Sequence, residues 1–228
     1  MKHIVLFSGG KDSTCMLLMM LENNMHIDDI VFCDTGHEFP EVYRHIKDVQ
    51  ADIGRKITVL KSEKGWQYWF TKHVKTKGKR KGQKGYGWPD WQCRWCVRVL
   101  KHEPLTRYIR NLSPAPYTYY AITYDERHRS HNNTYPGLPA FPLIDWKITQ
   151  NQALRYCYEQ GFDWNGLYRL FTRTSCFYCP MKRNSELETL YYFFPHLWRK
   201  MKKMDKLSWR PFKNPRSLAE IENRIRSS

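Results

Sequence analysis

The stretch SGGKDS at residues 8–13 constrains the fold of this chain more than any other. It follows an apolar run at residues 4–7 and precedes residues 14–21, which are apolar on nearly every side. This order predicts a buried strand, a tight glycine turn and the start of a buried helix. Glycines let the backbone approach an anion closely, and a helix start offers unpaired N–H groups at the positive end of its dipole. The stretch therefore predicts a phosphate-binding loop.

The side chains of this loop refine that prediction. Lys11 supplies a cation, and Ser8 and Ser13 supply hydroxyls. Asp12 would repel phosphate, so it is interpreted as a helix cap or as a ligand of Mg²⁺ that bridges phosphates. The spacing does not fit a Walker loop, which needs four residues between its first glycine and its Gly-Lys pair.

Strands and helices alternate after the loop. We expect a helix over 12–22, a strand over 30–33, a helix from 40 to about 53 and a strand over 57–60. This alternation predicts a doubly wound parallel α/β sheet. Ligands of such sheets bind beyond the carboxyl ends of the strands, and both SGGKDS and DTGHEFPE at 34–41 follow strands.

Two motifs resemble a known family. SGGKDS is similar to the PP-loop of the ATP pyrophosphatases, and DTGHEFPEVY at 34–43 is similar to the DTG-x-x-FPE-x-Y segment of the phosphoadenosine phosphosulfate (PAPS) reductase family. The resemblance implies a Rossmann-like fold of the adenine nucleotide alpha hydrolase (HUP) type, and covers residues 3 to about 205. It implies nucleotide contacts from Ser8, Gly9, Gly10, Lys11, Asp12, Ser13, Asp34, Thr35 and Gly36, with Lys11 and Asp12 catalytic.

Weaker matches to the family occur further along the chain. A cysteine-bearing segment runs into a helix that contains Arg98 and Lys101, and Glu126 and Arg129 match a family element that follows the strand predicted over 117–123. The resemblance makes these four side chains candidates for phosphate or substrate contacts. We expect residues 128–139 to form an irregular loop.

Four of the seven cysteines form two C-x-x-C pairs. Cys93 with Cys96 and Cys176 with Cys179 supply the four thiolates of a tetrahedral metal site. Both Zn²⁺ and a [4Fe–4S] cluster accept four thiolates. Pro180 after the last cysteine and the resemblance to the family favour the cluster, with Zn²⁺ as the alternative.

The charge of the chain predicts a polyanionic partner. The formal net charge is +16, and residues 72–84 contain seven Lys and Arg, two Gly and no acid. We expect this segment to be a mobile loop that closes over phosphates or binds nucleic acid, although a solvated loop without function is the alternative. Aromatic residues flank it, and most of these are expected to be core residues.

No run of 18 apolar residues occurs, and the N-terminus lacks the pattern of a signal peptide. We therefore expect a cytoplasmic protein without a membrane span, in which paired cysteines indicate metal rather than disulfides. The expected organisation is a nucleotide-binding domain over 1–165, with a basic cysteine-bearing insertion at about 66–100. A helical segment over 166–228 would pack on it and complete the four-cysteine site.

Three functions remain open. The first is an ATP pyrophosphatase enzyme that binds ATP and Mg²⁺ and adenylates a substrate. Its candidate acceptor is tRNA or DNA, and sulfur transfer from a donor protein is a candidate second step. A homodimer is the candidate assembly. The second is a sulfonucleotide reductase. That reaction uses a late cysteine in the family, whereas no cysteine follows Cys179 here. The third is a non-catalytic, zinc-containing nucleic-acid-binding protein, which would leave SGGKDS unexplained.

Overall fold

The computed structural model describes residues 1–131 and 135–227, and this part of the chain divides into two compact units. The first unit comprises Met1–Asp34, Phe39–Lys61 and His102–Thr174, and the second comprises Thr35–Glu38, Ser62–Lys101 and Ser175–Ser228. This division differs from the expected one, because the basic segment groups with the C-terminal helices and not with the sheet. Each unit is described by itself.

The first unit is built on a parallel sheet. Its described strands are β1 (His3–Leu6), β2 (Asp29–Asp34), β3 (Ile57–Lys61), β4 (Tyr117–Tyr119) and β5 (Leu138–Ala140), in the order β3-β2-β1-β4-β5. Every pairing between neighbours is parallel. The predicted α/β class and parallel sheet are thus confirmed.

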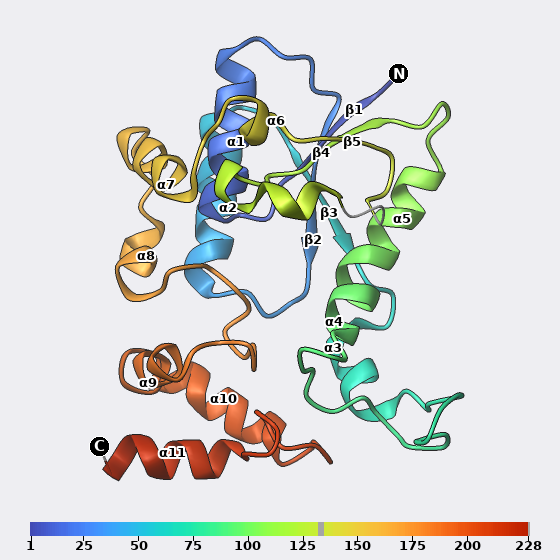
Figure 1. The fold of residues 1–228 in the computed structure, drawn as a ribbon, viewed down its shortest axis with the longest axis vertical. Helices are drawn as coiled ribbons and strands as arrows, with labels where there is room; N and C mark the ends of the chain where they lie inside the picture. The colour runs from blue at the N-terminus through green and yellow to red at the C-terminus, as the bar shows by residue number, and fades with distance from the viewer. Residues whose placement is uncertain (132–134, 228) are drawn as a thin grey trace. The chain divides into compact units, whose positions relative to one another are not determined.

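Helices cover both faces of this sheet (Figure 1). Leu105 and Ile109 of α5 (Glu103–Arg110) pack against Ile4 and Val31 on one face. Helices α1 and α2 lie on the other side of the sheet from α5. The helical segments of this unit are α1 (Lys11–Glu22), α2 (Pro40–Asp52), α5 (Glu103–Arg110), the 3-10 segment Tyr124–His131, α6 (Pro142–Asp145), α7 (Gln150–Glu159), the 3-10 turn Trp164–Gly166 and α8 (Leu167–Leu170).

The end of the sheet differs from expectation. The strand expected over 117–123 ends at Tyr119, and β5 lies in the region that was expected to be irregular. Both strands are short and β5 is largely exposed, so neither has the long apolar run by which a buried strand is recognised in a sequence. The expected loop also includes residues 132–134, which lie outside the described part of the chain.

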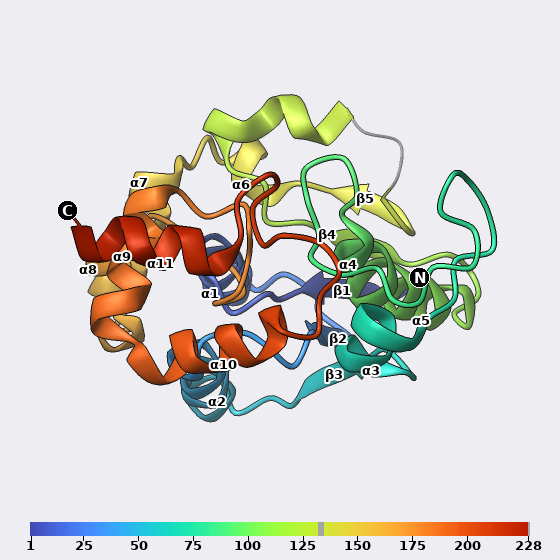
Figure 2. The same cartoon turned by 90° about the horizontal axis from the view of Figure 1, so that it is seen from below.

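The second unit has an aromatic core contributed by two distant parts of the sequence. Trp66 lies 4.3 Å from Tyr178 and 4.6 Å from Trp95, and Trp88 lies 4.9 Å from Phe212, between ring centroids. These rings are buried. Of the five aromatics that flank the basic run, however, only Trp66 and Trp88 are buried, whereas Trp69 and Tyr86 are half-buried and Trp91 is exposed, so the expectation that most would be core residues was wrong. The helical segments of this unit are α3 (Gly65–Gln67), the π-helical turn Tyr68–Lys72, α4 (Trp95–Val97), α9 (Asn184–Phe193), α10 (Pro195–Asp205) and α11 (Leu218–Ser227), and the π-helical turn Arg98–His102 ends it toward α5 (Figure 2).

Among the residues that the structure describes, no helix is long and apolar enough to cross a membrane.

Candidate functional site

The loop SGGKDS lies at the point of the sheet where the strand order reverses. Strand β1 pairs with β2 on one side and with β4 on the other, and the chain continues from β1 through α1 to β2. Residues 8–13 follow the carboxyl end of β1, and the 3-10 segment Tyr124–His131 comes soon after β4. In open α/β sheets this position is where ligands bind.

The backbone of the loop requires glycine at position 9, whereas Gly10 has an extended backbone. Gly9 has a φ of 73°, and a Cβ there would lie 2.9 Å from the side chain of Ile46. Its carbonyl accepts a hydrogen bond of 2.7 Å from Nε1 of Trp164. Gly10 is the N-cap of α1, and no side chain bonds the first N–H groups from that position. The loop is therefore held in one shape, with the helix start presented without a capping side chain.

The two serines hold the turn from within. The backbone N–H of Ser8 donates to Ser13 Oγ at 3.1 Å, and the two hydroxyl oxygens lie 3.0 Å apart. Ser13 Oγ also donates to the carbonyl of Gly10 at 2.9 Å. Ser13 is only 2% exposed, so its contribution in this structure is to the shape of the loop.

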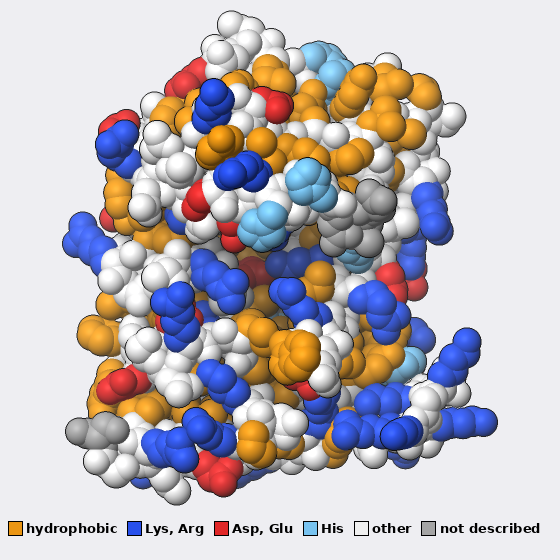
Figure 3. Space-filling view, in the orientation of Figure 1, with side chains coloured by type: hydrophobic (Ala, Val, Ile, Leu, Met, Phe, Trp, Pro, Cys, Tyr) orange, Lys and Arg blue, Asp and Glu red, His pale blue; other side chains and the backbone are white. Residues whose placement is uncertain are grey.

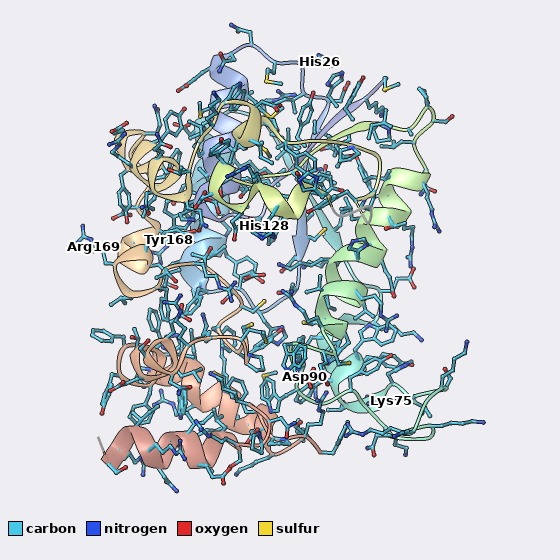
Figure 4. All side chains as sticks on the ribbon, in the orientation of Figure 1. His26, Lys75, Asp90, His128, Tyr168 and Arg169 are labelled. Carbon is cyan, nitrogen blue, oxygen red and sulfur yellow. The ribbon has the colours of Figure 1, made fainter. Side chains whose placement is uncertain are left out.

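Lys11 is a buried cation whose ammonium group has two partners. Its Nζ donates to a carboxylate oxygen of Asp12 at 2.9 Å and to Oε1 of Gln150 at 3.2 Å. Its backbone N–H donates to the hydroxyl of Tyr168 at 2.8 Å, and Tyr168 is seen on α8 in Figure 4. A lysine that is 5% exposed needs such partners, because an unpaired buried charge is costly.

The carboxyl group of Asp12 lies in a strongly desolvated and acidic environment. Burial raises its pKa, the ion pair with Lys11 opposes the rise, and the charges of Glu126 and Asp125 add to it. Gln150 links the two sides of the site, because its backbone N–H and its Nε2 donate to the carboxylate of Asp125 at 3.1 and 3.2 Å. The loop after β4 thus belongs to the same polar network as SGGKDS.

The four residues expected to contact phosphate or substrate lie in different units of the structure. Glu126 pairs with Arg129 within the first unit. Arg98 and Lys101 are in the second unit, where an Nη of Arg98 donates to the hydroxyl of Tyr86 at 3.2 Å and Lys101 lies 3.4 Å from Glu38. A role for them in substrate contact stays a prediction.

The segment DTG is divided between the units. Asp34 ends β2 and accepts a hydrogen bond of 2.6 Å from the hydroxyl of Tyr43, and its other oxygen lies 3.2 Å from Nζ of Lys61. Thr35 and Gly36 belong to the second unit, where the Thr35 hydroxyl donates to buried Glu38 at 3.2 Å. Nucleotide contacts from these three residues stay predictions.

The four paired cysteines are all in the second unit. Cys96 and Cys176 both lie within electrostatic reach of Cys179, whereas Cys93 lines a basic pocket with Lys75. Among the described residues, no three His, Cys, Asp or Glu side chains converge as a metal-binding group. The thiols have the right chemistry for a metal centre, but this arrangement does not form one, and the four-cysteine site stays a prediction.

Sequence reasoning missed several residues that hold the loop. Gln150, Trp164 and Tyr168 contact it from segments more than 130 positions away along the chain. Only Gln150 has a local sequence signal, since it lies between Thr149 and Gln152, whose spacing is that of a capping box at a helix start. Nothing in the local sequence indicates that Trp164 and Tyr168 fold back onto residues 9 and 11.

Comparison with known proteins decides the family. The model of the phosphoadenosine phosphosulfate reductase domain matches residues 2–182. The chain belongs to this family. The resemblance expected from SGGKDS and DTGHEFPEVY is thereby confirmed, and the match ends just before α9.

Relatives in the curated proteins are longer than this chain. An uncharacterized protein of Methanocaldococcus jannaschii is 31% identical over 214 residues, which are 86% of this chain and 40% of that protein. A second uncharacterized protein of the same organism is 28% identical, over 85% of this chain and 45% of its own length. The chain thus spans less than half of these relatives. The structure of a PAPS reductase from Candida auris, a phosphate complex, is similar at 17% identity and a TM-score of 0.48, over 75% of this chain and 78% of that one.

Proposed function

We propose that this chain is an ATP-dependent adenylating enzyme that cleaves ATP between the α and β phosphates at the loop SGGKDS. The observation that carries the proposal is the loop itself. Gly9 has a left-handed φ with no free space for a Cβ, the N-cap residue Gly10 supplies no capping side chain, and Lys11 and Asp12 lie together at the first turn of α1. A triphosphate is a ligand that matches a helix N-terminus and a lysine, and a cation bound by Asp12 would neutralise further charge.

In the proposed reaction, an oxygen of the acceptor attacks the α-phosphorus. The bond between the α-phosphorus and the bridging oxygen breaks, its electron pair leaves with pyrophosphate, and the acceptor becomes an adenylate after losing its proton to solvent. Lys11 stabilises the charge that develops on the pyrophosphate, for which its Nζ must exchange Asp12 or Gln150 for phosphate oxygens. Asp12 would hold Mg²⁺, which neutralises phosphate charge when bound.

We extend the proposal to the molecule that accepts the adenylyl group and to the reaction that follows adenylation. The net charge of +16 supports a nucleic acid, tRNA or DNA, as the acceptor. Displacement of AMP from the adenylate by sulfur of a donor protein is the second step that members of this family suggest. No step of this reaction is assigned to an iron–sulfur cluster, because the cysteines that would hold one do not converge among the described residues.

The test is product analysis with ATP labelled at the α or the γ phosphate. Protein is incubated with Mg²⁺ and ATP, alone and with total tRNA or single-stranded DNA. We expect labelled AMP or adenylated nucleic acid from the α label, and pyrophosphate from the γ label. Formation of ADP and phosphate would contradict the proposal. Release of sulfite from PAPS with a dithiol reductant, and no cleavage of ATP, would replace it with a sulfonucleotide reductase.

Asp12→Asn provides the matched variant, because it keeps the shape of the side chain and removes its charge. We expect turnover to fall by about 100-fold or more, since the charge that holds the cation is lost. Asp52→Asn is the control, because Asp52 is an exposed residue at the end of α2. Both variants should unfold in one transition near that of the wild type. A fully active Asp12→Asn variant would show that the loop was misassigned.

A further inference from the structure

The basic run at residues 72–84 has a defined structure in the second unit. The carbonyl of His73 accepts from the N–H of Gly85 at 2.7 Å, and the N–H of Lys75 donates to the carbonyl of Gln83 at 3.0 Å. Val74 and Lys84 form an antiparallel bridge. The run is therefore a hydrogen-bonded hairpin rather than the shapeless loop that its composition suggested, and we call residues 73–85 the basic hairpin.

The basic hairpin borders an open pocket of about 460 Å³. Lys75, Lys77, Lys79 and Arg80 line it, together with His73, Thr76, Tyr86 and Cys93. Lys and Arg side chains gather over this part of the unit in Figure 3. Four cations around one concavity repel one another, and a multivalent anion that enters it relieves that repulsion.

The acid nearest to the hairpin in the sequence does not compensate these charges. Asp90 forms an ion pair with Arg210, and its Oδ1 accepts the backbone N–H of Cys93 at 2.6 Å. Figure 4 labels Asp90 and Lys75 in this part of the unit. The positive field of the pocket therefore favours an anionic ligand from outside the chain.

Aromatic residues lie beside the cations. The charged groups of Lys75 and Arg80 lie 4.7 and 4.5 Å from the ring centroid of Trp209, which holds both near the pocket. Trp91 is 71% exposed, the most exposed of the large apolar side chains that the structure describes. It lies in sequence between Asp90, which pairs with Arg210, and Cys93, which lines the pocket. Trp91 is thus an exposed indole two positions along the chain from a residue that lines the cationic pocket. Cations and an exposed aromatic face are the two groups that bind a strand with phosphates and unpaired bases.

We propose that the basic hairpin, with Trp91, binds single-stranded nucleic acid, with the phosphodiester backbone in the pocket and a base stacked on Trp91. Several cations favour a repeated anion over a single phosphate, and an exposed indole favours unpaired bases over a duplex, whose base faces are already stacked. The inference rests on the proposed function in one respect only, since it names the surface that would hold a nucleic-acid acceptor. Binding itself requires neither ATP nor the loop SGGKDS.

The test is fluorescence anisotropy of a labelled single strand of about 20 nucleotides, as DNA and as RNA, without ATP. We expect binding that weakens as salt rises, and weaker binding of the matching duplex. The variant Lys77→Gln/Lys79→Gln/Arg80→Gln changes three exposed side chains and should lower affinity by about tenfold or more. It should also reduce the slope of log affinity against log salt by about 2, because each phosphate that is no longer neutralised removes roughly 0.7 from that slope.

The control removes the same charge elsewhere in the same unit. Lys200, Lys203 and Lys206 are exposed on or next to α10, and their triple change to Gln should alter affinity by less than about threefold. Trp91→Ala should weaken binding by about fivefold or more with the salt slope unchanged, because stacking involves no counterion release.

Equal losses of affinity in the two triple variants would overturn the inference, because binding would then follow net charge alone. So would stronger binding of the duplex, or competition by inorganic polyphosphate combined with no effect of Trp91→Ala. The proposed function fails separately, by the absence of AMP from ATP, and that result would leave this binding measurement unaffected.

Discussion

At the scale of single residues, the loop SGGKDS depends on Gly9 for two separate reasons. Its φ of 73° is unfavourable for any residue with a Cβ, and the space for that Cβ is filled by side chains of Ile46 and Val42 at 2.9 to 3.0 Å. The turn of the loop and the packing of its neighbours thus depend on the same residue.

We predict that Gly9→Ala lowers the free energy of unfolding by about 2 to 4 kcal/mol, the backbone strain and the overpacking together. Gly54→Ala is the matched control, because Gly54 has a φ of 61° with no atom within 4 Å of its Cβ position. Gly54→Ala should lower the free energy of unfolding only by the strain of the left-handed backbone, about 1 to 2 kcal/mol. Urea denaturation of both variants measures the difference, and equal losses would show that Ile46 and Val42 move aside freely.

His45 makes the first unit sensitive to acid. It is 2% exposed, its Nε2 lies 2.8 Å from the hydroxyl of Thr14 on α1, and burial lowers its pKa to about 3. An exposed imidazole has a pKa of about 6.5. Between these two pH values the unfolded chain binds a proton at this position and the folded chain does not.

We therefore predict that the free energy of unfolding falls as the pH drops from about 6.5 toward 3, by up to about 1.4 kcal/mol per pH unit from this group. His45→Gln should remove that part of the slope over this range. His26→Gln, a change at a side chain that is 70% exposed, should leave it in place. Urea denaturation at several pH values measures the slopes, and an unchanged slope in His45→Gln would contradict the role given to burial.

At the scale of elements, α7 connects the loop to the segment after β4. Gln150 at its start binds Lys11 and Asp125, and the thiol of Cys157 in its third turn donates to the carbonyl of Lys11 at 3.3 Å. A capping box fixes this start, since the N–H of Gln152 donates to Thr149 Oγ1 at 3.4 Å and the N–H of Thr149 donates to Oε1 of Gln152 at 2.9 Å.

Thr149→Ala should lower the free energy of unfolding by about 1 kcal/mol, because it leaves N–H groups at the start of α7 without their acceptor. Thr106→Ala, inside α5, is the control and should be close to neutral, since alanine favours a helix interior. If the proposed function holds, Thr149→Ala should also raise the KM for ATP through Gln150. Urea denaturation measures both free energies of unfolding. An equal decrease in Thr149→Ala and Thr106→Ala would show that the capping box does not stabilise α7.

At the scale of the whole molecule, the distribution of cysteines separates two environments. Cys15 and Cys157 are buried in the first unit, where burial raises the pKa of each thiol, the first to about 12. The four paired cysteines belong to the second unit, where Cys96 and Cys176 each lie within electrostatic reach of Cys179. Metal, if bound, is therefore expected in the second unit.

We predict that protein purified without oxygen contains iron and sulfide and absorbs near about 400 nm, and that Cys179→Ser lowers the metal content. Cys15→Ala is the control, because Cys15 is a core residue of the other unit. Elemental analysis and absorbance provide the measurement. Colourless protein with bound zinc would contradict the cluster, and metal content independent of Cys179 would contradict the whole site.

Much of the fold could be predicted because its signals are local. The runs at residues 4–7 and 30–33 are continuous and apolar, the signature of parallel strands buried on both faces, and they became β1 and β2. Strand β5 could not be predicted, because Leu138–Ala140 is three residues long, contains Pro139 and is mostly exposed. The residues of the candidate site likewise include some that the sequence predicts and others that it does not. SGGKDS is recognisable from adjacent residues, whereas Trp164 and Tyr168 contact it only through tertiary structure.

By itself, the sequence determined the family, the parallel sheet and the position of the loop SGGKDS at a strand end, because each depends on residues that are adjacent along the chain. Only the tertiary structure decided that Lys11 contacts Gln150, that Lys75 and Arg80 of the basic hairpin lie over Trp209, and that this hairpin groups with the C-terminal helices. These interactions join residues distant in sequence, and a sequence carries no local record of which burial and charge pairings will bring such residues together.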